Sequence, residues 1–262
     1  MLVSAEKTTD MTLRDEIETL RLAVQFMTRL PVPAGAPYDP ARMARSIRYY
    51  PLTGLLVGGI AALTLWIASA FWAGPIAVVL ALVTTTLITG ALHEDGFADM
   101  VDGFWGGHTT ERRLEIMRDS RLGSYGALAL IFLVLMNVVA LMSMPVSQAA
   151  VSLFTAHMLS RCAVVFAIDR GQYVRRTGAG QDVQKRLGHD GLYVVILTVA
   201  IGILPAIVSF GLWISLGALV VSLACGLGLL RFSNQKVGGY TGDVLGAIQQ
   251  LSCLAAILIF CL

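Results

Sequence analysis

Seven long apolar runs constrain this chain more than any other feature of its sequence. A helix that crosses a bilayer needs about 20 predominantly apolar residues. Runs of this kind cover approximately residues 52–73, 75–92, 125–143, 147–168, 192–210, 213–230 and 244–262. Only 14% of the 262 residues are charged, against about 25% in soluble domains. The sequence therefore predicts an all-α polytopic membrane helical bundle, with about seven transmembrane helices in a single integral-membrane domain, residues 1–262.

The positions of lysine and arginine predict the orientation of the bundle, because these residues concentrate in cytoplasmic segments. Of nineteen such residues, seven lie in the N-terminal arm 1–51, four in 93–124, five in 169–191 and two in 231–243. With a cytoplasmic N-terminus, seven spans put all four charged segments on the cytoplasmic side and the C-terminus outside. The lipid bilayer is thus a predicted partner, whereas a net charge of +2 is too small to indicate a nucleic-acid partner.

The N-terminal arm has a helical pattern of its own. Leu13, Ile17, Leu20, Val24 and Met27 recur at helical spacing, with polar residues on the other faces. An amphipathic helix of this kind can lie in the membrane interface or pack against the bundle, and the sequence alone favours neither.

The acidic segment 93–124 begins directly after the second apolar run and contains the first candidate site. If a helix continues through it, Asp95, Asp99 and Asp102 project within about 60° of one another. Three carboxylates on one face repel unless a cation lies between them, and oxygen ligands suit Mg²⁺ or Mn²⁺. We therefore predict these three aspartates as metal ligands and catalytic residues, with His93 as a further catalytic candidate. The alternative is a solvated acidic turn neutralised by arginines.

Other charged residues at the same membrane face are candidates for substrate binding. Arginines there can bind phosphate or pair with acids, and an arginine inside a span requires an acidic or phosphate partner unless it reaches the interface. Asp243 can complete a metal or substrate site or cap the last helix, and the basic segment 169–191 can attract an anion. The predicted substrate-binding residues are Arg118, Asp119, Arg121, Arg161 and Asp243.

Three motifs closely resemble the cobalamin synthase family, the adenosylcobinamide-GDP ribazoletransferases. They are Leu-His-x-Asp-Gly-x-Ala-Asp-x-x-Asp-Gly at 92–103, Leu-Glu-Ile-Met-Arg-Asp-Ser-Arg-Leu-Gly at 114–123 and Gly-Tyr-Thr-Gly-Asp-x-Leu-Gly at 239–246. Shorter matches at 29–33, 50–54 and 160–161 extend the resemblance over nearly the whole chain. Glu94 departs from the family pattern, in which an apolar residue usually stands between the histidine and the first aspartate.

The resemblance implies the last assembly step of adenosylcobalamin. In that family a multi-pass membrane enzyme joins adenosylcobinamide-GDP to alpha-ribazole or alpha-ribazole 5'-phosphate, releases GMP and requires Mg²⁺. It also implies a bacterial inner-membrane location with the active site facing the cytoplasm. His93 is a candidate base for the attacking hydroxyl or, alternatively, a helix-end histidine bonded to the backbone, and one of the three aspartates is another candidate base.

Two other functions also fit parts of the sequence. A CDP-alcohol phosphatidyltransferase likewise sets aspartates around a metal at a membrane edge, but its signature is Asp-Gly-x-x-Ala-Arg. The corresponding Asp-Gly-x-Ala-Asp at 95–99 is shorter by one residue and lacks the arginine. A transporter suits a seven-span bundle with Arg161 inside it. However, transporters place ionisable groups near the bilayer midplane, and nearly all of them lie at one face here.

Overall fold

Helices make up nearly all regular structure in the part of the chain that the computed structural model describes, residues 12–33, 35, 37, 39–175 and 187–262. One isolated β-bridge joins Tyr173 to Tyr240. In chain order the helices are α1 (Leu13–Met27), α2 (Pro40–Ser46), the 3₁₀ helix η1 (Ile47–Tyr49), α3 (Tyr50–Ser69), α4 (Gly74–Thr89), α5 (Leu92–Gly106), α6 (Thr110–Ile116), α7 (Ser124–Met142), α8 (Val146–Arg170), α9 (His189–Gly202), α10 (Leu204–Phe210), α11 (Leu212–Val237) and α12 (Gly242–Phe260).

Six of the seven predicted membrane-spanning runs coincide with long apolar helical segments, which confirms the fold class, and the second run, 75–92, falls on the shorter helix α4. Six helical segments are long and apolar enough to cross a membrane. The helices α4 and α5 meet the same criterion only as a pair, bent by 88° at their junction. The predicted break near Gly211 is also present, with this glycine at φ +84° between α10 and α11.

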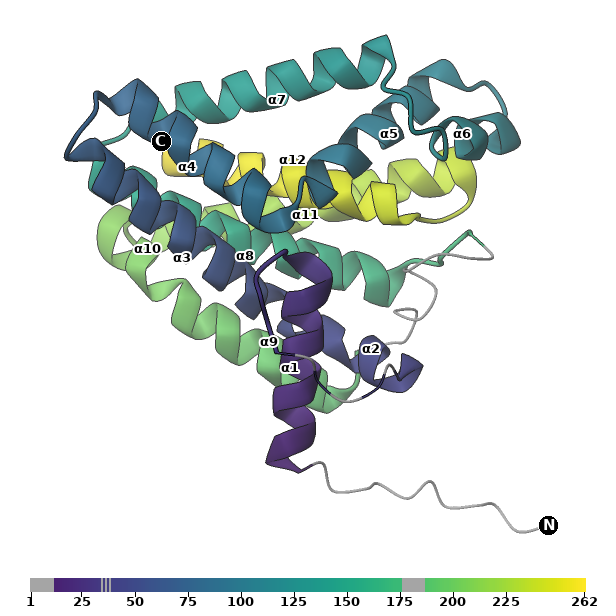
Figure 1. Cartoon of the computed structure of the whole chain (residues 1–262), viewed down its shortest axis with the longest axis horizontal. Coiled ribbons are helices and arrows are strands. Elements are labelled where there is room, and N and C mark those ends of the chain that lie inside the picture. The colour runs from purple at the N-terminus through teal and green to yellow at the C-terminus, as the bar shows by residue number, and fades with distance from the viewer. Residues whose placement is uncertain (1–11, 34, 36, 38, 176–186) are drawn as a thin grey trace.

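Helix α8 is the central helix of the bundle. It packs against α3, α11 and α12, and α12 packs in turn against α5 and α11 (Figure 1). Gly54 and Gly58 of α3 face the backbone of α8, where a Cβ atom would come within 2.3 Å of His157 O and 2.8 Å of Leu153 O. The two axes approach closely because small residues at this spacing remove the side chains between them.

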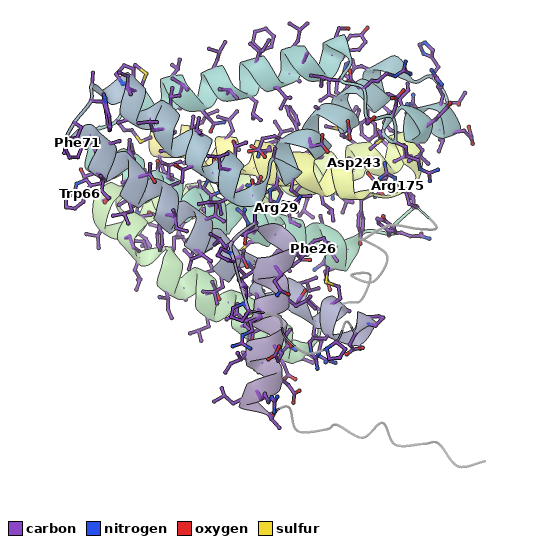
Figure 2. The ribbon with its side chains drawn as sticks, in the orientation of Figure 1. Phe26, Arg29, Trp66, Phe71, Arg175 and Asp243 are labelled. Carbon is purple, nitrogen blue, oxygen red and sulfur yellow. The ribbon has the colours of Figure 1, made fainter. Side chains whose placement is uncertain are left out.

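The two ends of the bundle differ in chemistry, as Figure 2 shows. Trp66 and Phe71 lie exposed near the α3–α4 turn, and we call this the aromatic end. Arg175 and Asp243 lie at the opposite end, which also carries α5, α6 and the α11–α12 turn and which we call the charged end. Exposed aromatic rings are typical of the membrane–water interface, so the spans run between these two ends.

Helix α1 confirms the predicted amphipathic helix and packs against the bundle, while its placement in the membrane interface stays a prediction. It begins with a capping box in which Thr12 and Asp15 bond to each other's backbone amides, a motif that satisfies free amides of the first turn. Its later turns bury Thr19, Ala23 and Met27 against the bundle, while Leu13 in the first turn is 77% exposed. The helix lies across the direction of the spans (Figure 1).

Candidate active site

The predicted helix through the acidic residues is present as α5, and a sharp turn sets its direction. Gly90 and Ala91 both adopt left-handed backbone conformations, with φ of 64° and 57°, and the Asp95 amide donates to Ala91 O at 2.9 Å. The turn costs conformational energy at Ala91, because residues with a Cβ atom rarely adopt positive φ. It carries α5 across the charged end of the bundle instead of continuing α4.

Two of the three sequence motifs meet where α5 crosses the start of α12. A Cβ atom on Gly96 would lie 2.9 Å from Asp243 Cα, and one on Gly246 would lie 3.0 Å from His93 O. Each helix therefore supplies a glycine at which the other backbone passes. This crossing brings the first aspartate of α5 and the aspartate of α12 to the same site, although they are far apart in sequence.

Three carboxylates gather around this crossing. Asp95 is exposed and Asp99 and Asp243 are half-buried. The negative charges of Asp95 and Asp243 act on the carboxylate of Asp99, and the positive charge of Arg175 opposes them. The charge of Asp102 acts on Asp99 in the same sense, so the repulsion predicted among the three aspartates is present and Asp243 adds to it.

Arg175 joins this site, although the sequence identified it only as one of five cations in the segment 169–191. Its guanidinium forms an ion pair with Asp243 and also donates to Met117 O at 3.1 Å, at the end of α6. The chain after α8 reaches this position because Val174 N donates to Tyr240 O at 3.1 Å and Tyr240 N donates to Gln172 O at 2.8 Å. These bonds are long-range in sequence, so no local pattern indicates them.

Asp102, the third predicted metal ligand, points to a different partner. Its carboxylate accepts hydrogen bonds from the backbone amides of Gly123 at 2.8 Å and Gly126 at 2.9 Å. These amides begin α7, whose N-cap Gly123 has no side chain with which to cap it. A carboxylate is favourable at the positive end of a helix, so Asp102 joins α5 to α7 as a cap supplied from another helix.

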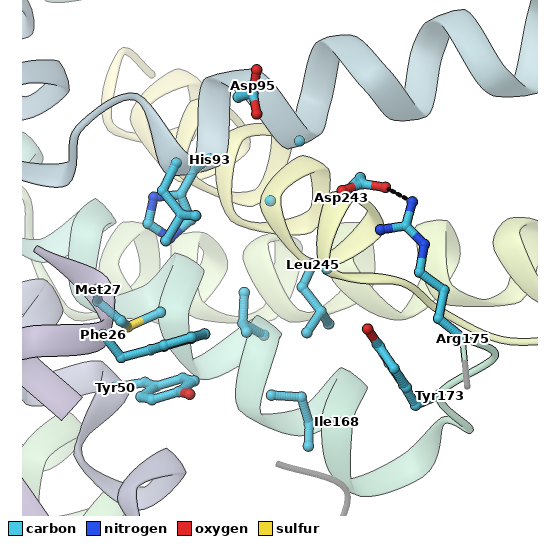
Figure 3. A pocket seen from close by; sticks show the side chains of 15 residues that line it. Phe26, Met27, Tyr50, His93, Asp95, Ile168, Tyr173, Arg175, Asp243 and Leu245 are labelled. Atoms are coloured by element: carbon cyan, nitrogen blue, oxygen red, sulfur yellow. Dashed lines mark hydrogen bonds and ion pairs between the residues drawn. The ribbon is translucent and has the colours of Figure 1, made fainter. Parts of the chain in front are cut away.

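A cavity of about 270 Å³ opens beside the α5–α12 crossing. Figure 3 shows Asp95, Asp243 and Arg175 on one side of it and Phe26, Met27 and Tyr50 on the other. His93 also lines the cavity, is 4% exposed, and its Nε2 atom has no hydrogen-bond partner among the described residues. The cavity thus combines a charged wall with an apolar, largely aromatic wall.

Three predicted substrate-binding residues lie away from this cavity, in the connection between α6 and α7. Arg118 is exposed, and Arg121 pairs with Asp119 through hydrogen bonds that lower the pKa of Asp119 to about 2. The cavity lining, as far as the chain is described, includes none of the three. Their contact with substrate stays a prediction. Arg176, Lys185 and Arg186 of the basic segment lie outside the described residues.

Arg161, also predicted to bind substrate, is fully buried inside α8. Its Nη1 atom donates to His157 O at 3.0 Å, while its Nε and Nη2 atoms have no partner in the described part of the chain. The negative charge of Glu94 attracts it. This arginine does not line the cavity, so the structure places it behind the site and its contact with phosphate stays a prediction.

The charged wall offers a donor set of the kind that a hard divalent cation takes. Asp95 and Asp243 line this wall, and Asp99 lies one turn further along α5, outside the cavity lining. All three supply only carboxylate oxygens, which suit Mg²⁺. Among the described residues, however, no three His, Cys, Asp or Glu side chains lie close enough together to hold a metal ion. Arg175 provides the compensating positive charge in the structure through its ion pair with Asp243. The donor type therefore suits Mg²⁺, but the three carboxylates are not grouped closely enough in this structure to hold the ion, and Asp243 is paired with Arg175.

Comparisons with known proteins agree with the motifs. A family model described as cobalamin-5-phosphate synthase matches residues 19–261. An adenosylcobinamide-GDP ribazoletransferase from Leptothrix cholodnii is 42% identical over 250 residues, covering 90% of this chain and 92% of that protein. One from Shewanella amazonensis is 38% identical over 254 residues, covering 96% and 97%. No solved structure matches the chain significantly.

Proposed function

The chain belongs to the cobalamin-5-phosphate synthase family, and from this premise we propose that it is an adenosylcobinamide-GDP ribazoletransferase. It transfers the adenosylcobinamide phosphate of adenosylcobinamide-GDP to alpha-ribazole or alpha-ribazole 5'-phosphate and releases GMP, in the final assembly of adenosylcobalamin. The observation that carries the proposal is the meeting of the 92–103 and 239–246 motifs at one cavity, with Asp95, Asp243 and Arg175 in its wall.

The reaction forms a P–O bond between a ribose hydroxyl of ribazole and the phosphorus on the cobinamide side of the diphosphate. The bond from that phosphorus to the bridging oxygen breaks, and GMP leaves with the electron pair. Arg175 binds the diphosphate, because a guanidinium can hold two phosphate oxygens at once. When Arg175 turns to the diphosphate, it releases the carboxylate of Asp243.

His93 takes the hydroxyl proton in this proposal. A neutral imidazole has one nitrogen that can accept a proton, and Nε2 of His93 is free of hydrogen bonds within the described residues and belongs to a side chain in the cavity wall. Asp102 has a positioning role, since both of its oxygens hold the start of α7. It keeps α5 in place beneath the reacting groups.

Mg²⁺ is the proposed cofactor, held by Asp95, Asp99 and Asp243. A divalent ion at this wall would neutralise charge on the diphosphate and stabilise the leaving group. The support for it is the all-oxygen donor set and the mutual repulsion of the carboxylates, which a cation relieves. The sequence predicted Asp102 as the third ligand. We propose Asp243 in its place, because both carboxylate oxygens of Asp102 accept hydrogen bonds from the start of α7.

We also propose that the charged end faces the cytoplasm of a bacterial cell and that the bilayer is the inner membrane. The support is the distribution of lysine and arginine, which apart from Arg161 lie in the segments 1–51, 93–124, 169–191 and 231–243. The described parts of the last three segments include α6, Arg175 and the α11–α12 turn, which lie at this end. Positive residues are retained on the cytoplasmic side.

The test uses the purified full-length protein in liposomes. GMP should appear from adenosylcobinamide-GDP only when ribazole and Mg²⁺ are both present, with free and phosphorylated ribazole assayed separately. Asp95→Asn should lower this rate by about a hundredfold or more, as loss of a metal ligand does at such sites. Asp190→Asn, which changes an exposed aspartate in the first turn of α9, is the matched control. Absence of GMP release from well-folded protein would overturn the proposed function.

A further inference from the structure

The apolar wall of the cavity has no role in the phosphoryl transfer itself. Phe26 and Met27 come from the last turn of α1, Tyr50 from the start of α3, and Ile168 and Leu245 from α8 and α12. The rings of Phe26 and Tyr50 stack nearly in parallel, with centroids 6.2 Å apart and planes inclined by 15°. Figure 3 shows this pair across the cavity from Asp95.

This wall is fixed in place by the fold. Tyr50 is 2% exposed. The chain after α1 is attached to the end of α4 by a hydrogen bond of 2.6 Å from Arg29 N to Ile88 O. Met27 is also buried in the core. A rigid aromatic surface binds a flat ring with little loss of conformational entropy, so the wall is suited to an aromatic ligand group.

From this arrangement, and resting on the proposed function, we infer that the apolar wall binds the aromatic base of ribazole, with the ribose hydroxyl directed to the charged wall. Both substrates carry a flat base. Guanine has several hydrogen-bonding groups on its edges, and burying them against Phe26, Met27 and Ile168 would leave them unpaired. The benzimidazole base of ribazole has a single free ring nitrogen and otherwise apolar edges, which match these side chains.

The inference gives α1 a function beyond packing and membrane contact. The ring of Phe26 forms part of the ribazole site, so the N-terminal helix helps to select the nucleophile. It also separates the two substrates in space. Ribazole lies between α1 and α12, while the diphosphate of adenosylcobinamide-GDP lies at Arg175 and the carboxylates.

The test compares Phe26→Ala with Phe210→Ala in full-length protein. Both residues are half-buried phenylalanines stacked on another aromatic ring, and Phe210 pairs with Phe260 at a centroid distance of 4.7 Å, at the far ends of α10 and α12 from the cavity. Phe26→Ala should weaken calorimetric binding of ribazole about tenfold, as loss of stacking on a base does. The KM for ribazole should rise by a similar factor, with the KM for adenosylcobinamide-GDP within twofold of wild type. Phe210→Ala should change neither KM.

A second variant tests the cavity from α12 instead of α1. Leu245→Trp fills the cavity from α12 and should abolish calorimetric ribazole binding, whether or not Phe26→Ala folds. A rise in the KM for adenosylcobinamide-GDP alone on Phe26→Ala would assign the wall to guanine and overturn the inference, as would unchanged ribazole binding in both variants. Because ribazole binding is measured without turnover, a protein that binds ribazole but releases no GMP would refute the proposed function and leave this inference standing.

Discussion

Replacing Asp102 by asparagine separates a structural role from a metal-binding role for this residue. The carboxylate is 8% exposed and accepts two amide hydrogen bonds, at 2.8 and 2.9 Å, from the start of α7. Asparagine keeps one accepting oxygen, but its NH₂ group faces the other amide and cannot accept from it. The variant therefore loses the charge and leaves one buried amide unpaired, a cost of about 2 to 3 kcal/mol.

The expected result is a lower melting temperature. At about 2 to 4 °C per kcal/mol for a chain of this size, the loss corresponds to roughly 5 to 10 °C. Buried thiols provide the assay, because Cys162 and Cys253 are 1% and 6% exposed and react with a fluorogenic maleimide only when the bundle opens. Manganese binding, followed by electron paramagnetic resonance, should remain.

Asp99→Asn is the matched comparison. No described residue donates a hydrogen bond to Asp99 in the way that α7 does to Asp102, and the charges of Asp95 and Asp243 act on its carboxylate. Removing its charge relieves repulsion, so the melting temperature should stay the same or rise while manganese binding weakens. If Asp102→Asn instead melts within 2 °C of wild type and loses manganese binding, the capping role is refuted and the metal-ligand prediction is supported.

Four further outcomes are expected. Gly96→Ala should lower the free energy of unfolding by about 1 to 3 kcal/mol, because the new Cβ atom would lie 2.9 Å from Asp243 Cα. Gly228→Ala is the control, because no atom lies within 4 Å of its Cβ position, and thermal unfolding compares the two variants. Arg175→Gln should raise the KM for adenosylcobinamide-GDP. It should also strengthen manganese binding to the substrate-free protein, since it removes the ion pair with Asp243. Unchanged manganese affinity would contradict the proposal that Asp243 is a metal ligand. Arg121→Gln should return the pKa of Asp119 from about 2 towards 3.8. Carboxyl NMR should show this change of pKa, and only in acid. Any stability that the Asp119 carboxylate contributes is present above its unfolded pKa and is lost as the pH falls through its folded pKa. A membrane-impermeant maleimide should label the exposed Cys261 in intact spheroplasts, and labelling only after lysis would contradict an external C-terminus.

The spans and α5 were predictable because they depend on properties that run along the chain. The apolar runs give helices wherever they occur, since a backbone in lipid must satisfy its hydrogen bonds within the segment. The spacing of Asp95, Asp99 and Asp102 gave the correct helix by the same local geometry. The hydrogen-bond partner of a carboxylate could not be predicted in this way, because it depends on the neighbouring helix.

Asp102 and Arg175 show where local reasoning ends. Asp102 is 21 residues from Gly123, and Arg175 is 68 residues from Asp243. No period or spacing relates these positions. Only the packing of α5 on α7, and the pairing of the chain at Tyr173 with the chain at Tyr240, makes them partners.

The sequence by itself determined the membrane bundle, its charged end and the motifs of the family, because hydropathy, charge and motif spacing are written along one dimension. The tertiary structure alone decided that Asp95 and Asp243 line one cavity, that Arg175 pairs with Asp243 and that Phe26 of α1 lines the same cavity with Tyr50. These contacts arise from how the helices cross, and two glycines, Gly96 and Gly246, permit the crossing at the site. The physical reason is that the direction of a side chain follows from the helix that carries it, whereas its contact partner depends on which other helix packs against that helix.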